Sequence, residues 1–382
     1  MRVADYIAER LVFLGIDTCF LVTGGGAMHL NDAIGGNPNI RKIYCHHEQG
    51  AAMAAEAFAR IANKPALLNV TTGPGGINAL NGVFGAFTDS IPMIVVSGQV
   101  KRETCLSFNP VAGLRQLGDQ EVDILAMAKP ITKYAQLLRE ATDIADMIDR
   151  AYLESTTGRP GPVWIDIPVD LQGSKLDEAY EQRITKPLPN ANYQSSKVTD
   201  HDILFVQEAL RTAKRPVILA GSGIRIAGAE KVLLSFAEKT GVPVATAWTH
   251  DIFPSDHPLY AGRPGTIGTR AGNFVIQNAD LVLILGSRLN IRQVSYNWHS
   301  FARNAKKIWV DVDEAEFRKP YIHVDKEIIS DVEYFLTKLI HFSPDNHVSS
   351  HAEWSKWCQN IQLKYSPKHS DYPVSVLSLI HI

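Results

Sequence analysis

The sequence predicts an α/β protein built from two doubly wound parallel-sheet domains. Short runs rich in Val and Ile alternate with amphipathic helical stretches, and this alternation occurs twice along the 382 residues. A hydrophobic content of 45% is enough for two buried cores. We therefore expect a first domain over residues 1–172, a linker over 173–197, a second domain over 198–345, and a helix with a short tail over 346–382.

The elements of the first domain follow from apolar runs bounded by turn residues. A helix is predicted near residues 3–14, and another begins at about Glu48, where a stretch rich in small apolar residues starts. Buried strands are expected near residues 19–22, 42–45, 67–71, 93–97 and 162–167.

A polar stretch over residues 171–196, with Pro187 and Pro189 and no sustained period, separates this round of elements from the next. The second domain then repeats the same rhythm. Its predicted helices cover residues 200–212 and 229–239, and its predicted strands cover 216–220, 242–245, 280–285 and 307–312. A last helix is predicted over residues 352–364.

Composition narrows the class of partner. With 38 basic and 40 acidic residues the formal net charge is -2, which gives no electrostatic reason to expect nucleic acid and leaves a small molecule as the expected partner. The four cysteines form no C-x-x-C pair, as expected in a reducing cytoplasm. Asp5, Glu9 and Arg10 interrupt the first apolar stretch, which excludes a secretory signal, and no run reaches membrane-spanning length.

Three polar or glycine-rich segments fall where predicted strands end, the edge at which open α/β sheets bind ligands. They cover residues 22–26 (VTGGG), 46–50 (HHEQG) and 71–78 (TTGPGGIN). Glycines there let the backbone approach a flat ring closely, and each following helix offers unpaired N–H groups. Taken singly, each segment is better explained as a tight strand-to-helix turn.

Taken in order, these segments resemble the thiamine-diphosphate-dependent enzymes of the acetolactate synthase-like group. The motifs that carry the resemblance lie at matching intervals and are residues 47–52 (HEQGAA), 55–60 (AEAFAR), 72–78 (TGPGGIN), 89–93 (DSIPM), 97–99 (SGQ), 119–124 (DQEVDI) and 158–163 (GRPGPV). They cover essentially all of residues 1–172. The resemblance implies an N-terminal pyrimidine-binding domain followed by a Rossmann-like central domain.

The resemblance also implies site residues. Glu48 and Gln120 would be catalytic, and His47 and Gln120 would lie on the substrate side. The residues implied in binding thiamine diphosphate are Gly24, Glu48, Thr72, Gly73, Pro74 and Asn78. No residue of this chain is expected to bind a metal.

The expected role of Glu48 has a chemical reason. A carboxyl group bonded to the aminopyrimidine N1′ favours the imino tautomer, whose 4′-nitrogen then serves as the base beside the thiazolium C2. An isolated His-Glu pair would instead be interpreted as a surface helix cap, and His47 as a histidine packed in a turn. A zinc-protease helix is excluded because Ala51 stands where its second histidine would be needed.

Several departures concern the acceptor substrate. Residues 24–28 read GGGAM where acetolactate synthases carry G-Y-P-G-G, Asp119 stands in place of a phenylalanine, and Val169 in place of a lysine. These changes put a second 2-oxo acid as acceptor in doubt. They resemble relatives among sugar-modifying enzymes, in which a two-carbon unit from pyruvate is joined to a keto sugar.

The second domain resembles the central domain of the same group through residues 220–223 (AGSG), 241–244 (GVPV) and 280–288 (DLVLILGSR). It completes no dinucleotide fingerprint, because Ile226 stands at the third glycine position. Arg288 matches one arginine of the flavin site in acetolactate synthases, whereas residues 262–265 (GRPG) depart from it. Flavin adenine dinucleotide (FAD) stays an open alternative, and a structural role between subunits is favoured.

Two functions remain from the sequence. The first is decarboxylation of a 2-oxo acid, expected to be pyruvate, followed by carboligation to a carbonyl acceptor, with a simple decarboxylase as its close alternative. We expect a homodimer or homotetramer whose active site is shared between subunits. The family holds magnesium through a G-D-G segment that this sequence lacks. We therefore expect an incomplete fragment, inactive alone; the second function is a non-catalytic two-domain remnant or assembly module.

Overall fold

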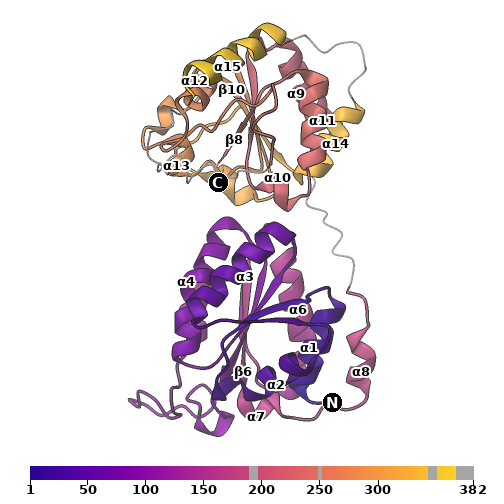
Figure 1. Cartoon of the computed structure of the whole chain (residues 1–382), viewed down its shortest axis with the longest axis vertical. Helices are drawn as coiled ribbons and strands as arrows, with labels where there is room; N and C mark the ends of the chain where they lie inside the picture. Colours follow the sequence, from indigo (N-terminus) through magenta and orange to yellow (C-terminus); the bar gives the residue numbers. More distant parts are fainter. Residues whose placement is uncertain (189–196, 248–251, 343–350, 367–382) are drawn as a thin grey trace. The chain divides into compact units, whose positions relative to one another are not determined.

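The computed structural model describes residues 1–188, 197–247, 252–342 and 351–366, and it confirms the predicted α/β class (Figure 1). The chain divides into two compact units, Met1–Asn192 and Tyr193–Ile382. The first holds a six-stranded sheet and the second a five-stranded sheet. Neighbouring strands run parallel throughout both sheets.

The strand order of the first sheet is β2-β1-β3-β4-β6-β5. Its strands are β1 (Thr18–Leu21), β2 (Arg41–Tyr44), β3 (Ala66–Val70), β4 (Met93–Gln99), β5 (Tyr134–Leu137) and β6 (Pro162–Pro168). The chain thus starts one strand from the edge of the sheet, adds β2 on one side and the remaining strands on the other, as in a doubly wound fold. The carboxyl ends of β1, β3 and β4 consequently lie side by side.

Helices cover both faces of this sheet (Figure 1). One face carries α1 (Val3–Phe13), α2 (Met28–Gly36), α6 (Ile144–Thr156) and α7 (Val169–Gln172), and the other carries α3 (Glu48–Ala62), α4 (Pro74–Asp89) and α5 (Ile124–Ala128). Successive residues of β4 serve opposite cores: Ile94 packs on the first face, and Met93 and Val95 pack on the second.

The second sheet has the strand order β11-β10-β9-β7-β8. Its strands are β7 (Pro216–Ala220), β8 (Val244–Thr246), β9 (Leu281–Leu285), β10 (Lys306–Asp311) and β11 (Lys326–Ile329). One face is covered by α9 (Asp200–Thr212), α10 (Gly223–Ile226), α11 (Glu230–Thr240) and α14 (Val332–His341), and the other by α12 (Arg270–Asn278), α13 (Ile291–Val294) and α15 (Ala352–Lys364).

Short 3₁₀ turns complete the described secondary structure. They are η1 (Gly25–Ala27), η2 (Arg102–Thr104), η3 (Lys129–Ile131), η4 (Ala141–Asp143), η5 (Trp298–Ser300) and η6 (Glu314–Arg318).

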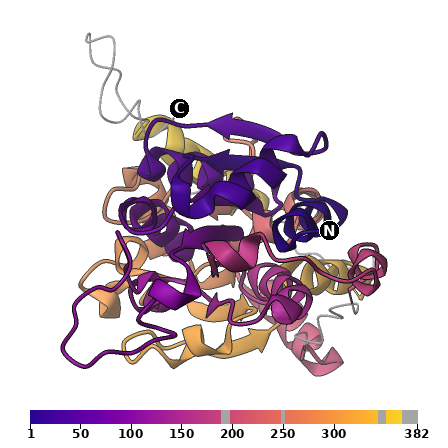
Figure 2. The ribbon, with the colours of Figure 1, turned by 90° about the horizontal axis from the view of Figure 1, so that it is seen from below.

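The stretch predicted as a linker contains a helix, α8 (Ala179–Ile184), before it passes into residues 189–196, outside the described part. The buried Arg10 of α1 reaches this stretch and donates 2.7 Å hydrogen bonds to the carbonyls of Ile184 and Lys186. The N-terminus lies beside the same segment in both views (Figures 1 and 2), and the Met1 carbonyl accepts a 2.9 Å hydrogen bond from Leu176 N. The first part of the expected linker therefore packs on the first unit.

None of the helices in the described ranges is both long enough and apolar enough to cross a bilayer.

Candidate functional site at the carboxyl edge of the first sheet

The loops after β1 and β3 touch at the carboxyl edge of the first sheet. Gly26 N donates a 3.1 Å hydrogen bond to Thr71 Oγ1, and the Asn31 side chain donates one of 3.1 Å to the Gly24 carbonyl. A Cβ atom on Gly24 would lie 2.5 Å from Thr71 Cβ. Position 24 therefore admits no side chain, and the predicted residue Gly24 lies directly against the loop that leads to Thr72.

Glu48 is the first residue of α3 and lies beside α4. Its Oε2 accepts a 3.0 Å hydrogen bond from Asn78 Nδ2, so the structure brings these two predicted residues together. Its Oε1 faces Gly75, where an added Cβ would lie 3.4 Å away. The half-buried carboxylate forms no ion pair with any residue of the described ranges. It consequently retains hydrogen-bonding capacity beside a wall that carries no side chain.

His47 is the N-cap residue of α3. Its Nδ1 accepts a 3.1 Å hydrogen bond from Gln49 N, which satisfies one of the first N–H groups of the helix. The ring is exposed to solvent. The structure thus gives His47 a local capping role, and its predicted place on the substrate side stays a prediction.

Gly73 and Gln120 face each other across two backbone turns. Gly73 caps α4 with φ 60°, and a Cβ atom there would lie only 2.3 Å from the Gln120 carbonyl oxygen. Gln120 itself has φ 59°, a left-handed conformation that a residue with a Cβ adopts at some energetic expense. Pro74 follows as the first residue of α4, where a missing N–H is tolerated. The predicted residues Gly73, Pro74 and Gln120 therefore lie together.

The turn that carries Gln120 is held by the neighbouring Glu121 carboxylate. This side chain accepts hydrogen bonds of 3.0 Å from both Leu117 N and Gly118 N, and a further one from Leu106 N. Burial acts to raise the pKa of Glu121, but these backbone N–H groups outweigh it and hold that pKa below its usual range. The carboxylate is therefore ionised at neutral pH and holds the backbone of residues 106, 117 and 118 in place.

A series of hydrogen-bonded, buried polar side chains begins at Thr72. Thr72 Oγ1 donates to Gln99 Oε1 at 2.9 Å, and Gln99 Nε2 donates to Asp166 Oδ2 at 2.8 Å and to the Val122 carbonyl at 3.1 Å. On the far side of Asp166, Ser97 Oγ donates to Oδ1 at 2.6 Å. Burial raises the pKa of Asp166 to about 7, although the hydrogen bonds from Ser97 and Gln99 oppose this shift.

Sequence reasoning gave no role to Gln99, Asp166 or Thr71. A signal was present for Asp166, since it is a lone carboxylate within the apolar strand β6. Its partners could not be inferred, because Ser97 and Gln99 lie 69 and 67 residues away in the chain. Only the parallel register of β4 and β6, which places Ser97 opposite Asp166, brings the three together.

In the described ranges there is no cluster of three or more His, Cys, Asp or Glu side chains that could hold a metal ion. The carboxylates of this edge are engaged separately, Glu48 with Asn78 and Asp166 with Ser97 and Gln99.

The corresponding edge of the second unit is closed by its own glycines. A Cβ on Gly221 would lie 2.3 Å from the Gly286 carbonyl oxygen, and one on Gly223 would lie 2.6 Å from Gly286 Cα. These glycines therefore serve backbone packing. Arg288 contributes its carbonyl to Lys319 Nζ. Arg263 is different, because its side chain is buried and its Nε and Nη1 have no hydrogen-bond partner in the described part of the chain.

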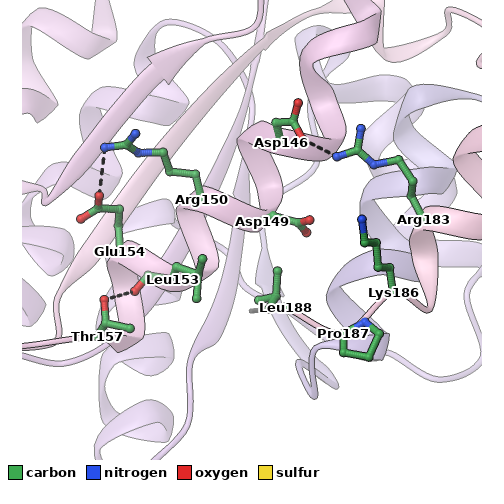
Figure 3. A pocket seen from close by; sticks show the side chains of 10 residues that line it. All are labelled: Asp146, Asp149, Arg150, Leu153, Glu154, Thr157, Arg183, Lys186, Pro187 and Leu188. Atoms are coloured by element: carbon green, nitrogen blue, oxygen red, sulfur yellow. Dashed lines mark hydrogen bonds and ion pairs between the residues drawn. The ribbon is translucent and has the colours of Figure 1, made fainter. Parts of the chain in front are cut away.

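A cavity of about 730 Å³ lies elsewhere in the first unit, between α6 and the segment that follows α8 (Figure 3). The charged side chains around it form ion pairs, which are Arg183 with Asp146, Arg150 with Glu154, and Asp149 with Arg10. None of the predicted site residues lines this cavity. The candidate site is therefore the loop cluster around Glu48, Thr72 and Gln120.

Comparisons with known proteins match both units. The family model for the thiamine pyrophosphate enzyme N-terminal TPP binding domain matches residues 1–127, and the model for the thiamine pyrophosphate enzyme central domain matches residues 203–339. The chain is 32% identical over 386 residues to the acetolactate synthase large subunit of Lactococcus lactis, with 99% of this chain and 64% of that protein covered.

Two further relatives agree. The acetolactate synthase isozyme 1 large subunit of Escherichia coli is 32% identical over 385 residues, which is 99% of this chain and 64% of that protein. The probable acetolactate synthase large subunit of Methanocaldococcus jannaschii is 34% identical over 344 residues, which is 89% of this chain and 56% of that protein. The chain thus spans less than two thirds of the length of these relatives.

Proposed function

Because the chain belongs to the thiamine pyrophosphate enzymes of the acetolactate synthase-like group and carries their N-terminal and central domains, we propose that its first unit binds the aminopyrimidine half of thiamine diphosphate. One observation carries the proposal. The Glu48 carboxylate begins a helix, accepts one hydrogen bond from Asn78, and has no ion pair within the described residues. It is therefore available to a ring nitrogen.

The loops around Glu48 suit a flat ring. Gly24, Gly73 and Gly75 all lie where an added Cβ would meet neighbouring atoms within 2.8 Å, so the backbone itself forms the surface. Thr72 is buried behind Gly73, and Asn78 holds Glu48 from α4. A surface of backbone and small side chains lets an aromatic ring approach closely.

The proposed chemistry assigns one task to each side chain. Bound thiamine diphosphate supplies a thiazolium carbon that becomes nucleophilic once it is deprotonated. Glu48 holds a proton at the ring N1′, and this favours the tautomer whose exocyclic nitrogen acts as the base. Asn78 keeps the Glu48 carboxylate directed to that position through its 3.0 Å hydrogen bond. Gln120, carried on the turn that Glu121 pins, would orient the substrate, with His47 nearby as a second polar contact.

For the whole protein we propose decarboxylation of a 2-oxo acid, with pyruvate as the first candidate, and transfer of the remaining two-carbon unit to a carbonyl acceptor. The residues described here contribute the aminopyrimidine side of that site. They offer no cluster for magnesium. We therefore assign the diphosphate and its magnesium ion to another domain of the active assembly, which we propose to be a homodimer or homotetramer in a reducing cytoplasm.

The second candidate function is a non-catalytic binding or assembly module, and the lack of a metal-binding cluster in the described ranges is the observation that favours it. The two candidates differ in the steps that come after cofactor binding. A carboligase exchanges the cofactor C2 proton with solvent and releases carbon dioxide from pyruvate. A binding module does neither.

The test is the substitution Glu48→Gln in the complete, magnesium-loaded protein. Exchange of the cofactor C2 proton with deuterated solvent, followed by NMR, should slow by orders of magnitude, because an amide cannot hold the N1′ proton as the carboxyl does. Glu103→Gln is the matched control, since Glu103 is an exposed carboxylate in the same unit. Unchanged exchange in Glu48→Gln would remove Glu48 from this role, and binding without exchange in the unaltered protein would favour the second candidate.

A further inference from the structure

The buried Gln99 side chain forms hydrogen bonds to two segments of the candidate site, one through Thr72 and one through Val122. Gln99 is the last residue of β4, and its side chain is 3% exposed. All four hydrogen bonds that its amide can form at close range are made: Oε1 accepts from Thr72 Oγ1 and Val100 N, both at 2.9 Å, and Nε2 donates to Asp166 Oδ2 and the Val122 carbonyl. The amide has no unused capacity and cannot turn without losing bonds.

The orientation of this amide is fixed by its partners. A backbone N–H only donates and a backbone carbonyl only accepts, so Oε1 must face Val100 N and Nε2 must face the Val122 carbonyl, with Asp166 beside it. Asp166 is oriented in turn, because the Trp164 indole donates at 2.8 Å to Ser97 Oγ and so directs the Ser97 hydroxyl proton to Oδ1. The Thr72 hydroxyl is left as a donor to Gln99 Oε1.

The segments that contain Thr72 and Val122 also contact each other directly. Thr72 precedes Gly73, and Val122 follows Gln120 by two residues. The Gln120 carbonyl occupies the space that a Gly73 side chain would take, 2.3 Å from an ideal Cβ. These contacts form a closed ring. Gln99 bonds to Thr72, the neighbouring Gly73 packs on Gln120, and Val122, two residues on, bonds back to Gln99. The length of the Gln99 side chain thus sets how far apart the two turns lie.

We propose that Gln99 is a positioning residue that fixes Gln120 relative to the Gly73 turn, with Asp166 as the buried anchor that orients its amide. Gln99 touches neither cofactor nor substrate in this assignment; it acts through Thr72 and Val122. The inference deepens the proposed function and rests on it only where cofactor binding is concerned. A purely structural role for Gln99 would stabilise the unit as a whole without a selective effect on the Gln120 turn.

The first measurement is hydrogen–deuterium exchange of the purified chain, which needs no ligand. Gln99→Met keeps the length and apolar stem but removes the amide. Peptides covering residues 116–123 should exchange about fivefold faster or more, because one tie of that segment is lost, while peptides from α1 keep their rates. Gln116→Leu is the comparison, since the Gln116 amide donates to the Glu121 carbonyl within the same loop, at 2.8 Å. It removes a bond inside the segment, not a tie to β4, and should speed exchange of residues 116–123 less than Gln99→Met does. Equal exchange of residues 116–123 in Gln99→Met and the unaltered chain would overturn the proposal.

The second measurement uses a pair of substitutions that swaps the amide and the carboxylate between positions 99 and 166. Gln99→Glu sets an acceptor against the Asp166 carboxylate, and adding Asp166→Asn to the same chain restores a donor between positions 99 and 166. The double variant should be more resistant to urea and should bind thiamine, the probe without phosphate, more tightly than Gln99→Glu alone. Residues 116–123 should exchange fast in both variants, because a glutamate carboxylate at position 99 cannot donate to the Val122 carbonyl. A double variant no better than Gln99→Glu would overturn the anchor role of Asp166. If the exchange results are as expected but the unaltered chain binds no thiamine, the positioning role stands and aminopyrimidine binding by this chain is refuted.

Discussion

Glu48 and Asp166 are carboxylates of the same unit in opposite surroundings. Glu48 is half-buried at the start of a helix, with Asn78 as its donor and the bare surface of Gly75 beside it. Asp166 is 2% exposed, and it accepts from Ser97 and Gln99 without a cation nearby. A buried carboxylate that is compensated only by neutral donors holds its proton more tightly than one in water. Glu48 is thus accessible to a ligand, whereas Asp166 is enclosed in the core.

Asp166 makes stability depend on pH. Burial raises its pKa to about 7 from an ordinary value of 3.8, and the Asp123 carboxylate adds to the shift. Between these values the folded protein binds more protons than the unfolded chain, so the free energy of unfolding falls as pH rises to about 7 and is then constant. Asp166→Asn should remove this dependence, on the order of 4 kcal/mol. Urea unfolding at about pH 5 and about pH 8 captures roughly 3 kcal/mol of it, because only about two pH units of the titration lie in that interval, and parallel pH curves for both proteins would contradict it.

Arg263 yields a second prediction at this scale. The residue is 8% exposed, and its guanidinium Nε and Nη1 lack partners among the described residues. A buried charge without a partner destabilises the fold, and an apolar side chain of similar length removes that penalty. Arg263→Met should therefore raise the thermal midpoint of the ligand-free protein, measured by calorimetry. Lower stability would show that the guanidinium is satisfied, and a visible flavin spectrum lost in the variant would identify FAD as the group that satisfies it.

Helices α3 and α4 approach each other unusually closely, and this contact places Glu48 beside Asn78. The buried residues of α3 are four alanines, and those of α4 include Gly75, Gly76 and Gly82. A Cβ on Gly82 would lie 2.5 Å from Ala52 Cβ and 2.7 Å from Met53 N. The Glu48–Asn78 hydrogen bond of 3.0 Å is formed about one helical turn before this contact, so the spacing of the helices sets its length.

The helix contact is tested by two glycine substitutions on α4. Gly82→Ala forces α3 and α4 apart and should destabilise the protein by roughly 1–3 kcal/mol while weakening thiamine binding. Gly85→Ala, three residues along, meets nothing within 4 Å, and should stabilise it by about 0.5–1 kcal/mol through helix propensity alone. Chemical denaturation gives both values, and equal effects of the two substitutions would refute the role of the contact.

Helices and strands whose own residues carry a capping motif or an apolar run were predicted well, whereas elements defined by contacts between residues distant in sequence were not. The helix over residues 200–212 is α9, whose start is fixed by a capping box of Thr199 and Asp202, and the helix over residues 352–364 is α15. Strand β5 was not predicted, because its edge position leaves it partly exposed and without an apolar run. For the site, motif order pointed to Glu48 and Asn78, whereas the polar chain through Gln99 arises only from strand register.

At the scale of the whole molecule, each unit buries its own cores on both faces of its own sheet. The first unit nevertheless leaves an apolar face exposed on its closely packed helix pair. Phe84 is 53% exposed and Ile77 42% exposed on α4, and Met53 is 46% exposed on α3. Apolar side chains gathered on one face are typical of a surface that binds another protein. The same two helices carry Glu48 and Asn78 at their N-terminal ends.

We expect this face to join copies of the chain. Phe84→Glu should shift the protein from an oligomer towards the monomer in sedimentation experiments, because a charge cannot be buried in an apolar interface without a partner. Leu204→Glu provides the comparison, since Leu204 is 58% exposed on α9 of the other unit. An unchanged mass in Phe84→Glu would place the contact elsewhere.

The left-handed backbone of Gln120 has a consequence for anyone who redesigns the specificity of this protein. Its φ of 59° admits glycine, asparagine and aspartate readily and penalises β-branched and bulky residues, whatever pocket they would line. A saturation library at position 120 should therefore be filtered by backbone conformation before it is filtered by substrate fit. Selection experiments would gain more diversity from Asp119, its exposed neighbour outside the left-handed region, than from the residue at the centre of the site.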